Sequence, residues 1–336
     1  MARSPSNLDE LVARARTHPP IRVAIVAAAQ GLALKTVKEA TSLGLIEAKL
    51  IGDRDAILQC AKDADLDIKA DGIISATDEA MAARQGVELV KSGNADAVMK
   101  GHIHTDTLMK ALLNSTSGLR RPDRRVSHVF MVDVPTYPKL LAVTDAAINI
   151  APDLMAKAQI LENAIDLLRL IGIETPKAAV LSAVETINPA IISTLDAASL
   201  TLMNSRGQIA GAIVDGPLAF DNAISAEAAR EKGIVSEVAG DADILLVPDL
   251  ISGNILAKNL EYLAGAMAAG VVMGLSAPVV LSSRADPPAA RLAALALAVL
   301  MHQGERGVQR PEREAESGSS IDCAAQPEAA CCPSGA

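Results

Sequence analysis

Short apolar runs alternate with longer amphipathic segments along most of this chain. The apolar runs predict strands at 23–28, 47–51, 72–75, 97–100, 178–184, 209–214, 243–247 and 279–281. The segments between them predict helices at 32–42, 53–61, 78–91, 189–204, 225–232, 255–272 and 292–302. Such alternation is typical of parallel strands joined by right-handed helical crossovers, so we expect a doubly wound α/β fold.

The pattern changes in the middle of the chain. Residues 126–132 and 140–144 form two consecutive strand signals around Pro135 and Pro138, which predicts an antiparallel pair, and a long helix follows over 152–171. We therefore expect one α/β domain over 1–142 and a second that begins at 143.

Composition narrows the class of protein. Of 336 residues, 50% are hydrophobic but only 1% aromatic, so the core must be built from Ala, Val, Leu and Ile. This suits strands that are covered by helices on both faces. The net charge of −9 argues against a nucleic-acid-binding protein, which usually has a basic face.

The sequence shows no targeting or membrane signal. The first residues lack the apolar region of a secretory signal, and the uncharged stretch 263–281 is rich in Ala and Gly and contains Pro278. We expect no membrane association and a cytoplasmic location. The cysteines have no zinc-site spacing, and residues 304–336 have the composition of a disordered tail.

Polar residues follow the strand expected at 279–281. Ser283, Arg284 and Asp286 come directly after it, and Pro287 then opens a helix. Ligands of open α/β sheets bind beyond the carboxyl ends of the strands. A hydroxyl and a guanidinium there suit an oxyanion, because Arg can donate two hydrogen bonds to one phosphate group.

A second such junction follows the strand at 243–247. Ser252, Gly253 and Asn254 are expected to open the helix at 255, where exposed N–H groups would form an anion site, or else simply to cap the helix. Lys258 lies one turn further on and would face the same ligand.

These motifs resemble the phosphate acetyltransferase and phosphate butyryltransferase family. The resemblance covers about residues 20–302 and rests on GNILAK (253–258), SSRAD (282–286), MKGHIHTDTLMKALL (99–113), DGPLAFDNAIS (215–225) and VTDAAINIAPDL (143–154). It implies acyl transfer between coenzyme A and inorganic phosphate, with coenzyme A as a substrate and no bound cofactor.

The resemblance also implies an architecture. Family members have two α/β domains with a cleft between them, as in isocitrate and isopropylmalate dehydrogenases. It predicts that the last helix, about 287–303, returns to the first domain, so that the second domain spans 143–286. It implies a homodimer as well, for which the apolar helix expected at 263–273 offers a surface.

For the first junction, the resemblance implies that Arg284 binds the phosphoryl group and that Ser283 stabilises the transition state. Asp286 is either the general base for the thiol of coenzyme A or a helix cap before Pro287. The acetyl-specific branch places its Asp six residues after the Arg, where this chain has Ala290. The identity of the base and the preferred acyl chain therefore stay open.

Other candidate residues lie outside the two junctions. Lys100 and Thr105 resemble the family's loop that contacts phosphate, and we expect no metal site at the histidines between them. Arg121 and Arg124 belong to a basic cluster suited to the phosphates of coenzyme A, or to a solvated turn. Asp215 is a further candidate at a strand end.

Two other functions remain possible at this stage. The chain lacks the GxGxxG, GxxxxGK[ST] and GxSxG motifs, and it shows no obvious acylated nucleophile, which favours direct transfer in a ternary complex. A non-catalytic protein that binds coenzyme A or acyl phosphate is one alternative. An NAD-dependent dehydrogenase of the same fold is the other, although we find no metal-binding carboxylate cluster for it.

Overall fold

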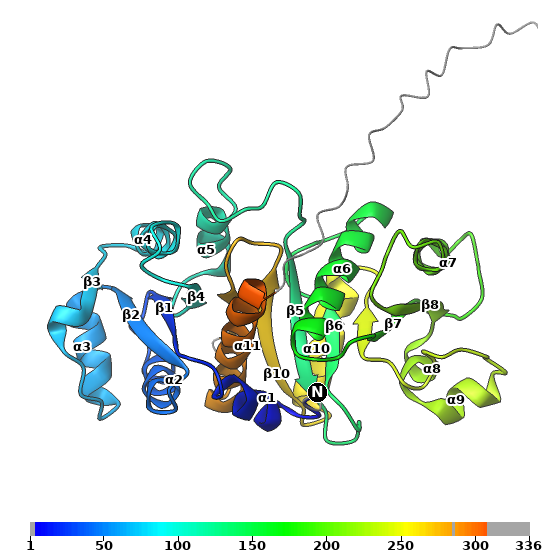
Figure 1. Ribbon diagram of the computed structural model, residues 1–336, viewed down its shortest axis with the longest axis horizontal. Coiled ribbons are helices and arrows are strands. Elements are labelled where there is room, and N and C mark those ends of the chain that lie inside the picture. Colours follow the sequence, from blue (N-terminus) through cyan, green and yellow to red (C-terminus); the bar gives the residue numbers. More distant parts are fainter. Residues whose placement is uncertain (1–3, 284–285, 308–336) are drawn as a thin grey trace, which may run out of the picture.

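The computed structural model describes residues 4–283 and 286–307, the last three of them by backbone alone. One mixed sheet of 11 strands runs through this part of the chain in the order β3-β2-β1-β4-β11-β10-β5-β6-β9-β7-β8 (Figure 1). The strands are β1 (Ile21–Val26), β2 (Ile46–Gly52), β3 (Ile73–Ser75), β4 (Ala97–Lys100), β5 (Ser127–Asp133), β6 (Leu141–Thr144), β7 (Lys177–Leu181), β8 (Ile213–Leu218), β9 (Ile244–Leu246), β10 (Met267–Met273) and β11 (Val279–Val280).

Helices cover both faces of the sheet. They are α1 (Leu8–Ala15), α2 (Gly31–Ser42), α3 (Arg54–Asp63), α4 (Glu79–Lys91), α5 (Thr105–Leu112), α6 (Leu154–Leu170), α7 (Ile192–Ser205), α8 (Phe220–Ile224), α9 (Ala226–Glu231), α10 (Leu250–Tyr262) and α11 (Pro288–Gly307), with a short 3-10 turn at Ala70–Gly72. Several start where the sequence supplies a cap: the carboxylates of Asp53, Asp78 and Asp153 accept backbone N–H groups at the starts of α3, α4 and α6.

The strand directions confirm the expected α/β class. Strands β3, β2, β1, β4 and β11 are parallel to one another, and so are β6, β9, β7 and β8. Strands β10 and β5 join the two groups by antiparallel pairing, and the pairing of β5 with β6 is antiparallel, as the pattern around the two prolines predicted. The two parallel groups therefore point in opposite directions.

The apolar core differs between the two faces of the sheet. Alternate residues of β10 belong to different clusters: Val271 packs into a single core that continues under α6 and α11, whereas Val272 and Ala268 belong to two separate cores on the other face. Strand periodicity produces this separation, because successive side chains point to opposite faces. The boundary between the two separate cores falls near Gly270 of β10.

The prediction of a single helix over 255–272 is wrong. The helix α10 begins at Leu250 and ends at Tyr262, and β10 begins only five residues later, in the centre of the sheet. The stretch from Met267 to Met273 is too uniformly apolar for periodicity to separate a buried strand from a buried helix. Since Ala268 to Met273 are buried in the sheet, this stretch cannot provide the dimer surface suggested by the sequence.

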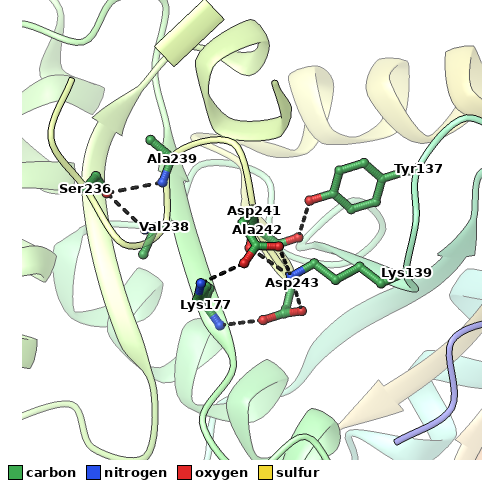
Figure 2. Close-up of polar contacts among 9 residues, drawn as sticks. All are labelled: Tyr137, Lys139, Lys177, Ser236, Val238, Ala239, Asp241, Ala242 and Asp243. Carbon is green, nitrogen blue, oxygen red and sulfur yellow. Dashed lines mark hydrogen bonds and ion pairs between the residues drawn. The ribbon is translucent and has the colours of Figure 1, made fainter. Parts of the chain in front are cut away.

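A charged network ties the connection between β5 and β6 to the starts of β7 and β9 (Figure 2). Lys139 Nζ lies 2.7 Å from Asp243 Oδ1 and 2.8 Å from Asp241 Oδ1, and Lys177 Nζ lies 2.6 Å from Asp241 Oδ2. The Tyr137 hydroxyl donates to the Ala242 carbonyl at 2.6 Å. The network fixes the second group of parallel strands at their amino ends.

No helix in the described residues combines the length and the apolar character that a membrane span requires. The expected disordered tail lies outside these residues from 308 onward, and so do three of the four cysteines.

Candidate functional site

The strand ends of β4 and β11 lie side by side. The two strands are parallel, with Val98 opposite Val279 and Met99 opposite Val280, so the loops that follow them leave the same edge of the sheet. Lys100 ends β4 and is only 5% exposed. Thr105 begins α5 and is exposed to solvent. The structure thus brings the loop of Lys100 and Thr105 next to the loop of Ser283.

Backbone hydrogen bonds hold the first of these loops on β1. The N–H of Gly101 donates to the Val26 carbonyl at 2.8 Å, and the N–H of His102 donates to the Ala27 carbonyl at 2.7 Å. Gly101 is needed because a Cβ atom there would lie 2.4 Å from the Ala27 oxygen. Within the described residues, no group of three or more His, Cys, Asp and Glu side chains is arranged to hold a metal ion.

Ser283 and Asp286, which follow β11, bond to each other. The N–H of Ser283 donates to Asp286 Oδ2 at 2.6 Å, and the N–H of Asp286 lies 3.3 Å from the Ser283 carbonyl. Ser283 is exposed, whereas Ser282 is buried. Arg284, the predicted phosphate ligand, lies outside the described residues.

Asp286 has an unusual electrostatic environment. Burial raises the pKa of its carboxyl group, and Glu261 adds to the increase, while the hydrogen bond from Ser283 and the charges of Lys258 and Arg291 oppose it. The last turns of α10 therefore lie close enough to act on Asp286. Ala290, which stands where a related branch has its Asp, is buried in α11.

Arg291 is a residue that the sequence reasoning missed. Its guanidinium donates to the carbonyls of Ser283 at 2.9 Å and Asp286 at 3.1 Å, and to the side chain of Gln30 at 3.3 Å. Burial lowers the pKa of Arg291, and the Asp286 carboxylate opposes this effect. One signal was available in the sequence: an Arg in an otherwise Ala- and Leu-rich helix that follows the motif directly.

Ser252, Gly253 and Asn254 lie inside helix α10. The prediction that they precede the helix is wrong. Asp249 is the cap of α10, and its carboxylate accepts both the N–H and the hydroxyl of Ser252, at 2.9 Å each. Asn254 donates to the Ala146 carbonyl at 3.2 Å, and Gly253 leaves room for the Asp145 carbonyl, 3.0 Å from where its Cβ would lie.

Lys258 lies further along α10. Its ammonium group pairs with Glu261 at 2.6 Å and stands over the ring of Tyr262, 5.7 Å from the centroid. Six residues of helix separate Ser252 from Lys258, about 9 Å at the usual helical rise. The charges of Lys258 and Glu261, near the end of α10, act on Asp286.

Arg121 and Arg124 lie at the other end of β10. With Asn163 and Asp166 they line a small pocket beside Met273. Arg124 pairs with Asp166 at 3.1 Å, and its Nη1 is buried without a hydrogen-bond partner among the described residues. Leu281 pairs near Gly270, so the length of β10 keeps these arginines roughly 10 Å or more from the Ser283 loop.

Asp215 is far from the other candidates. The sequence placed it at the end of a strand over 209–214, but β8 spans Ile213–Leu218 and Asp215 lies within it, with Oδ1 accepting the N–H of Gly216 at 2.8 Å. In the order of the sheet, β8 is six strands from β11. That is about 28 Å at the usual strand spacing, so the sheet does not bring Asp215 to the loop.

His128 and Asp145 were also missed. His128 is 1% exposed and lies at the boundary between the two separate cores, where Gly270 leaves room for its ring. The ring bonds to the Leu281 carbonyl, two residues before Ser283, and Nδ1 has no partner in the described part of the chain. Burial lowers the pKa of His128 to about 4, although Asp145 and that carbonyl raise it.

Comparisons with known proteins agree on one family. A family model described as phosphate acetyl/butaryl transferase matches residues 75–299. The phosphate acetyltransferase of Rhizobium meliloti is 47% identical over 305 residues, which cover 91% of this chain and 96% of that protein. The phosphate butyryltransferase of Clostridium acetobutylicum is 41% identical, with coverages of 88% and 98%.

A solved structure agrees with them. A branched-chain phosphotransacylase from Enterococcus faecalis superposes with a TM-score of 0.73 at 34% identity, covering 84% of this chain and 99% of that one. A phosphotransacetylase from Streptococcus pyogenes has the same fold, with a TM-score of 0.73 at 22% identity.

Proposed function

Because this chain belongs to the phosphate acetyl/butyryl transferase family, we infer that it is an acyltransferase that exchanges acyl-CoA plus phosphate for acyl phosphate plus coenzyme A. Its extensive identity with enzymes of both names supports acetyl or another short acyl group as the cargo. The observation that carries the site is the parallel pairing of β4 with β11, which gathers the loops of Lys100 and Ser283.

The loop after β11 is the proposed reaction centre. In the forward reaction a phosphate oxygen attacks the thioester carbonyl carbon, the carbon–sulfur bond breaks, and the thiolate leaves with the electron pair. We assign Arg284 to the phosphate and the exposed hydroxyl of Ser283 to the developing oxyanion. Lys100 and Thr105, on the adjoining loop, are proposed phosphate contacts.

We propose Asp286 as the group that accepts the thiol proton when coenzyme A attacks acyl phosphate. Its burial supports this role, since a carboxyl with a raised pKa holds a proton more readily near neutral pH. The hydrogen bond from Ser283 uses one carboxylate oxygen, so capping of the loop and proton transfer are compatible.

Helix α10 and the arginine pair are proposed to bind the longer substrate. Lys258 lies at the end of α10 nearest Asp286, and Ser252, Gly253 and Asn254 continue the same helix toward its start. Coenzyme A is long enough to reach beyond one loop, so Arg121 and Arg124 remain our candidates for its phosphates. In this proposal Asp215 makes no direct contact at the reaction centre.

The two-domain division also remains our proposal, with residues 1–142 and 287–303 in the first domain and 143–286 in the second. So do a cytoplasmic location and a homodimer. In the described residues, every exposed large apolar side chain except Leu32 falls between 150 and 263, which supports an interface on the second domain. Light scattering at assay concentration tests the dimer, and a monomeric mass contradicts it.

Neither alternative function is favoured. A dehydrogenase of the same fold would require the metal-binding carboxylates that a nicotinamide-linked mechanism of this class uses, and the family is a transferase family. A protein that only binds coenzyme A would have no need of Ser283 on an exposed loop beside Lys100. Measurement of turnover distinguishes the acyltransferase from the binding protein directly.

The test is release of free thiol from acetyl-, propionyl- and butyryl-CoA with and without phosphate. We expect phosphate-dependent release by the wild type and its loss in Arg284→Ala. Arg206→Ala is the control, because Arg206 is exposed at the end of α7, which packs on β7 and β8 at the end of the sheet away from β11. Binding of coenzyme A without release from any thioester would contradict the enzyme and favour the binding protein.

A further inference from the structure

Arg291 is the largest fully buried side chain in the described residues. It lies in the first turn of α11 and is 1% exposed. A guanidinium group stays charged at any physiological pH, so its burial is unfavourable unless its N–H groups are hydrogen-bonded. The reason for its presence must therefore lie in the groups that it contacts.

Two of these groups bracket the proposed reaction centre. Nη2 donates to the Ser283 carbonyl at 2.9 Å, and Nε donates to the Asp286 carbonyl at 3.1 Å. Because the N–H groups of a guanidinium lie in one rigid plane, the two bonds fix the positions of both carbonyls together. Arg291 thus fixes the backbone at Ser283 and at Asp286.

A third contact ties the loop to the rest of the sheet edge. Nη1 donates to Gln30 Oε1 at 3.3 Å, and Gln30 lies between β1 and α2. The loop after β4 is also bonded to the end of β1, through Gly101 and His102. Both loops of the site are therefore tied to the end of β1 and the residues that directly follow it.

The charge of Arg291 matters as well as its shape. Its Nε lies 3.1 Å from the Asp286 carbonyl oxygen, so the guanidinium is close enough to favour the ionised form of the Asp286 carboxyl group. In a buried position a charge is weakly screened, so it contributes positive potential where phosphate and the oxyanion carry negative charge.

We propose that Arg291 is a positioning residue for acyl transfer: its forked hydrogen bond fixes the backbone carbonyls of Ser283 and Asp286, and its buried positive charge lies beside the proposed oxyanion site. This inference rests on the proposed function of that loop. It assigns Arg291 no contact with substrate.

The test compares Arg291→Met, which removes the charge and the bonds, with Arg291→Lys, which keeps the charge but loses the fork. Lys157→Met is the matched control, because Lys157 of α6 is also a buried cation, paired with Asp196 of α7 at 2.6 Å. For each variant we would measure kcat, the KM for phosphate, the KM for acyl-CoA, and inhibition by sulfate as an unreactive oxyanion. Circular dichroism and Tm establish that the protein is folded at the assay temperature.

For Arg291→Met we expect the phosphate KM and the sulfate inhibition constant to rise about tenfold or more, the range for hydrogen bonds to charged groups, with little change in the acyl-CoA KM. Arg291→Lys should bring the phosphate KM part of the way back to the wild-type value, while its kcat stays as low as that of Arg291→Met. Lys157→Met should lower Tm and leave the kinetic constants unchanged.

Two results overturn the inference. One is a folded Arg291→Met with wild-type kcat and phosphate KM. The other, which decides if Arg291→Met does not fold, is Arg291→Lys with wild-type constants. Failure of the proposed function is distinct, because the wild type itself would then release no thiol in response to phosphate.

Discussion

The backbone N–H of Ser283 donates a 2.6 Å hydrogen bond to the carboxylate of Asp286. This bond links the segment that follows β11 to the segment that precedes α11. The same carboxylate is partly buried, and burial raises its pKa. Asp286 therefore combines a structural role that is visible in the structure with the proton-accepting role that we propose.

Replacement of Asp286 by Asn separates these roles. Asn keeps a side-chain oxygen that accepts from Ser283 but cannot take a proton. If Asp286 is the base, kcat for acyl-CoA formation from acyl phosphate should fall by about 10² to 10⁴, the usual contribution of general-base catalysis. Asp153→Asn is the control, since Asp153 accepts the N–H of Ala156 at a similar 2.7 Å at the start of α6, outside the loops assigned to the reaction. Wild-type kcat in Asp286→Asn would leave Asp286 as a cap alone.

The pH profile gives a second measure of Asp286. A base must be ionised to accept a proton, and a raised pKa moves the loss of the ionised form to higher pH than the ordinary value of 3.8. We expect kcat of the wild type to fall as the pH drops through this raised pKa. The acidic limb should be absent from the residual activity of Asp286→Asn; an unchanged limb would point to another group.

His128 should make stability depend on pH. Burial holds its pKa at about 4 in the folded protein, against 6.5 for an ordinary His. Between these values the unfolded chain binds the extra proton and the folded chain does not, so stability is full above pH 6.5 and falls as the pH drops toward 4. The loss is about 3 kcal/mol at most, at 1.36 kcal/mol per unit of pKa.

Urea unfolding at pH 7 and pH 5 measures this dependence. His128→Gln does not titrate, so its free energy of unfolding should change less between the two pH values than that of the wild type. His104→Gln is the control, because His104 is exposed at the start of α5. Equal pH dependence in wild type and His128→Gln would show that other groups dominate.

The sequence predicted the elements whose boundaries are marked by polar residues. The strand expected at 97–100 is β4 residue for residue, and the helix expected at 78–91 is α4 preceded by its cap. Polar residues mark both boundaries: the exposed His102 follows the strand, and Asp78 precedes the helix as its cap. The loop of Ser283 was found for the same reason, since polar residues followed a buried strand.

What the sequence could not supply depends on distant contacts. Nothing local distinguishes β10 from a helix, because its identity as a strand comes from pairing with β5 and β11. Likewise, His128 bonds to the Leu281 carbonyl from a strand that lies 153 residues earlier in the sequence. The separation of Asp215 from the loop also follows from strand order, which the sequence did not reveal.

The network of Lys139 should contribute to stability unequally through its two carboxylates (Figure 2). Asp243 is buried and accepts from Lys139 and from the N–H of Lys177 at 2.8 Å, whereas the side chain of Asp241 is 52% exposed. Asp243→Asn should lower the free energy of unfolding by about 2 kcal/mol, and the surface-exposed Asp241→Asn by less than about 1 kcal/mol. Chemical denaturation of both variants measures the difference.

Acid adds a check on Asp241. Partial burial alone would raise its pKa, but hydrogen bonds from Lys139 and Lys177 outweigh this and hold the pKa below its usual value. Its contribution to stability is therefore present above the unfolded value of 3.8 and disappears as the pH falls through the lower folded pKa. Equal losses of unfolding free energy in Asp241→Asn and Asp243→Asn would contradict the ranking of the two carboxylates by burial.

Gly101 should be intolerant of any side chain. A Cβ atom at this position would lie 2.4 Å from the Ala27 oxygen and 2.6 Å from the Val26 oxygen, and both are backbone atoms that cannot turn away. Gly101→Ala should therefore push the loop of Lys100 and Thr105 off β1, lowering the free energy of unfolding by at least about 1–3 kcal/mol, the usual cost of overpacking. Because this loop adjoins that of Ser283, we also expect the phosphate KM to rise.

The control for Gly101 is Gly72→Ala. A Cβ atom at Gly72 meets nothing within 4 Å, so this variant should unfold and turn over nearly as the wild type does. Thermal unfolding together with the phosphate KM distinguishes two ways of failing. A stable Gly101→Ala with wild-type KM would mean that the loop accommodates the methyl group and is not fixed by β1. A destabilised variant with wild-type KM would mean that the loop contributes to folding but not to the binding of phosphate.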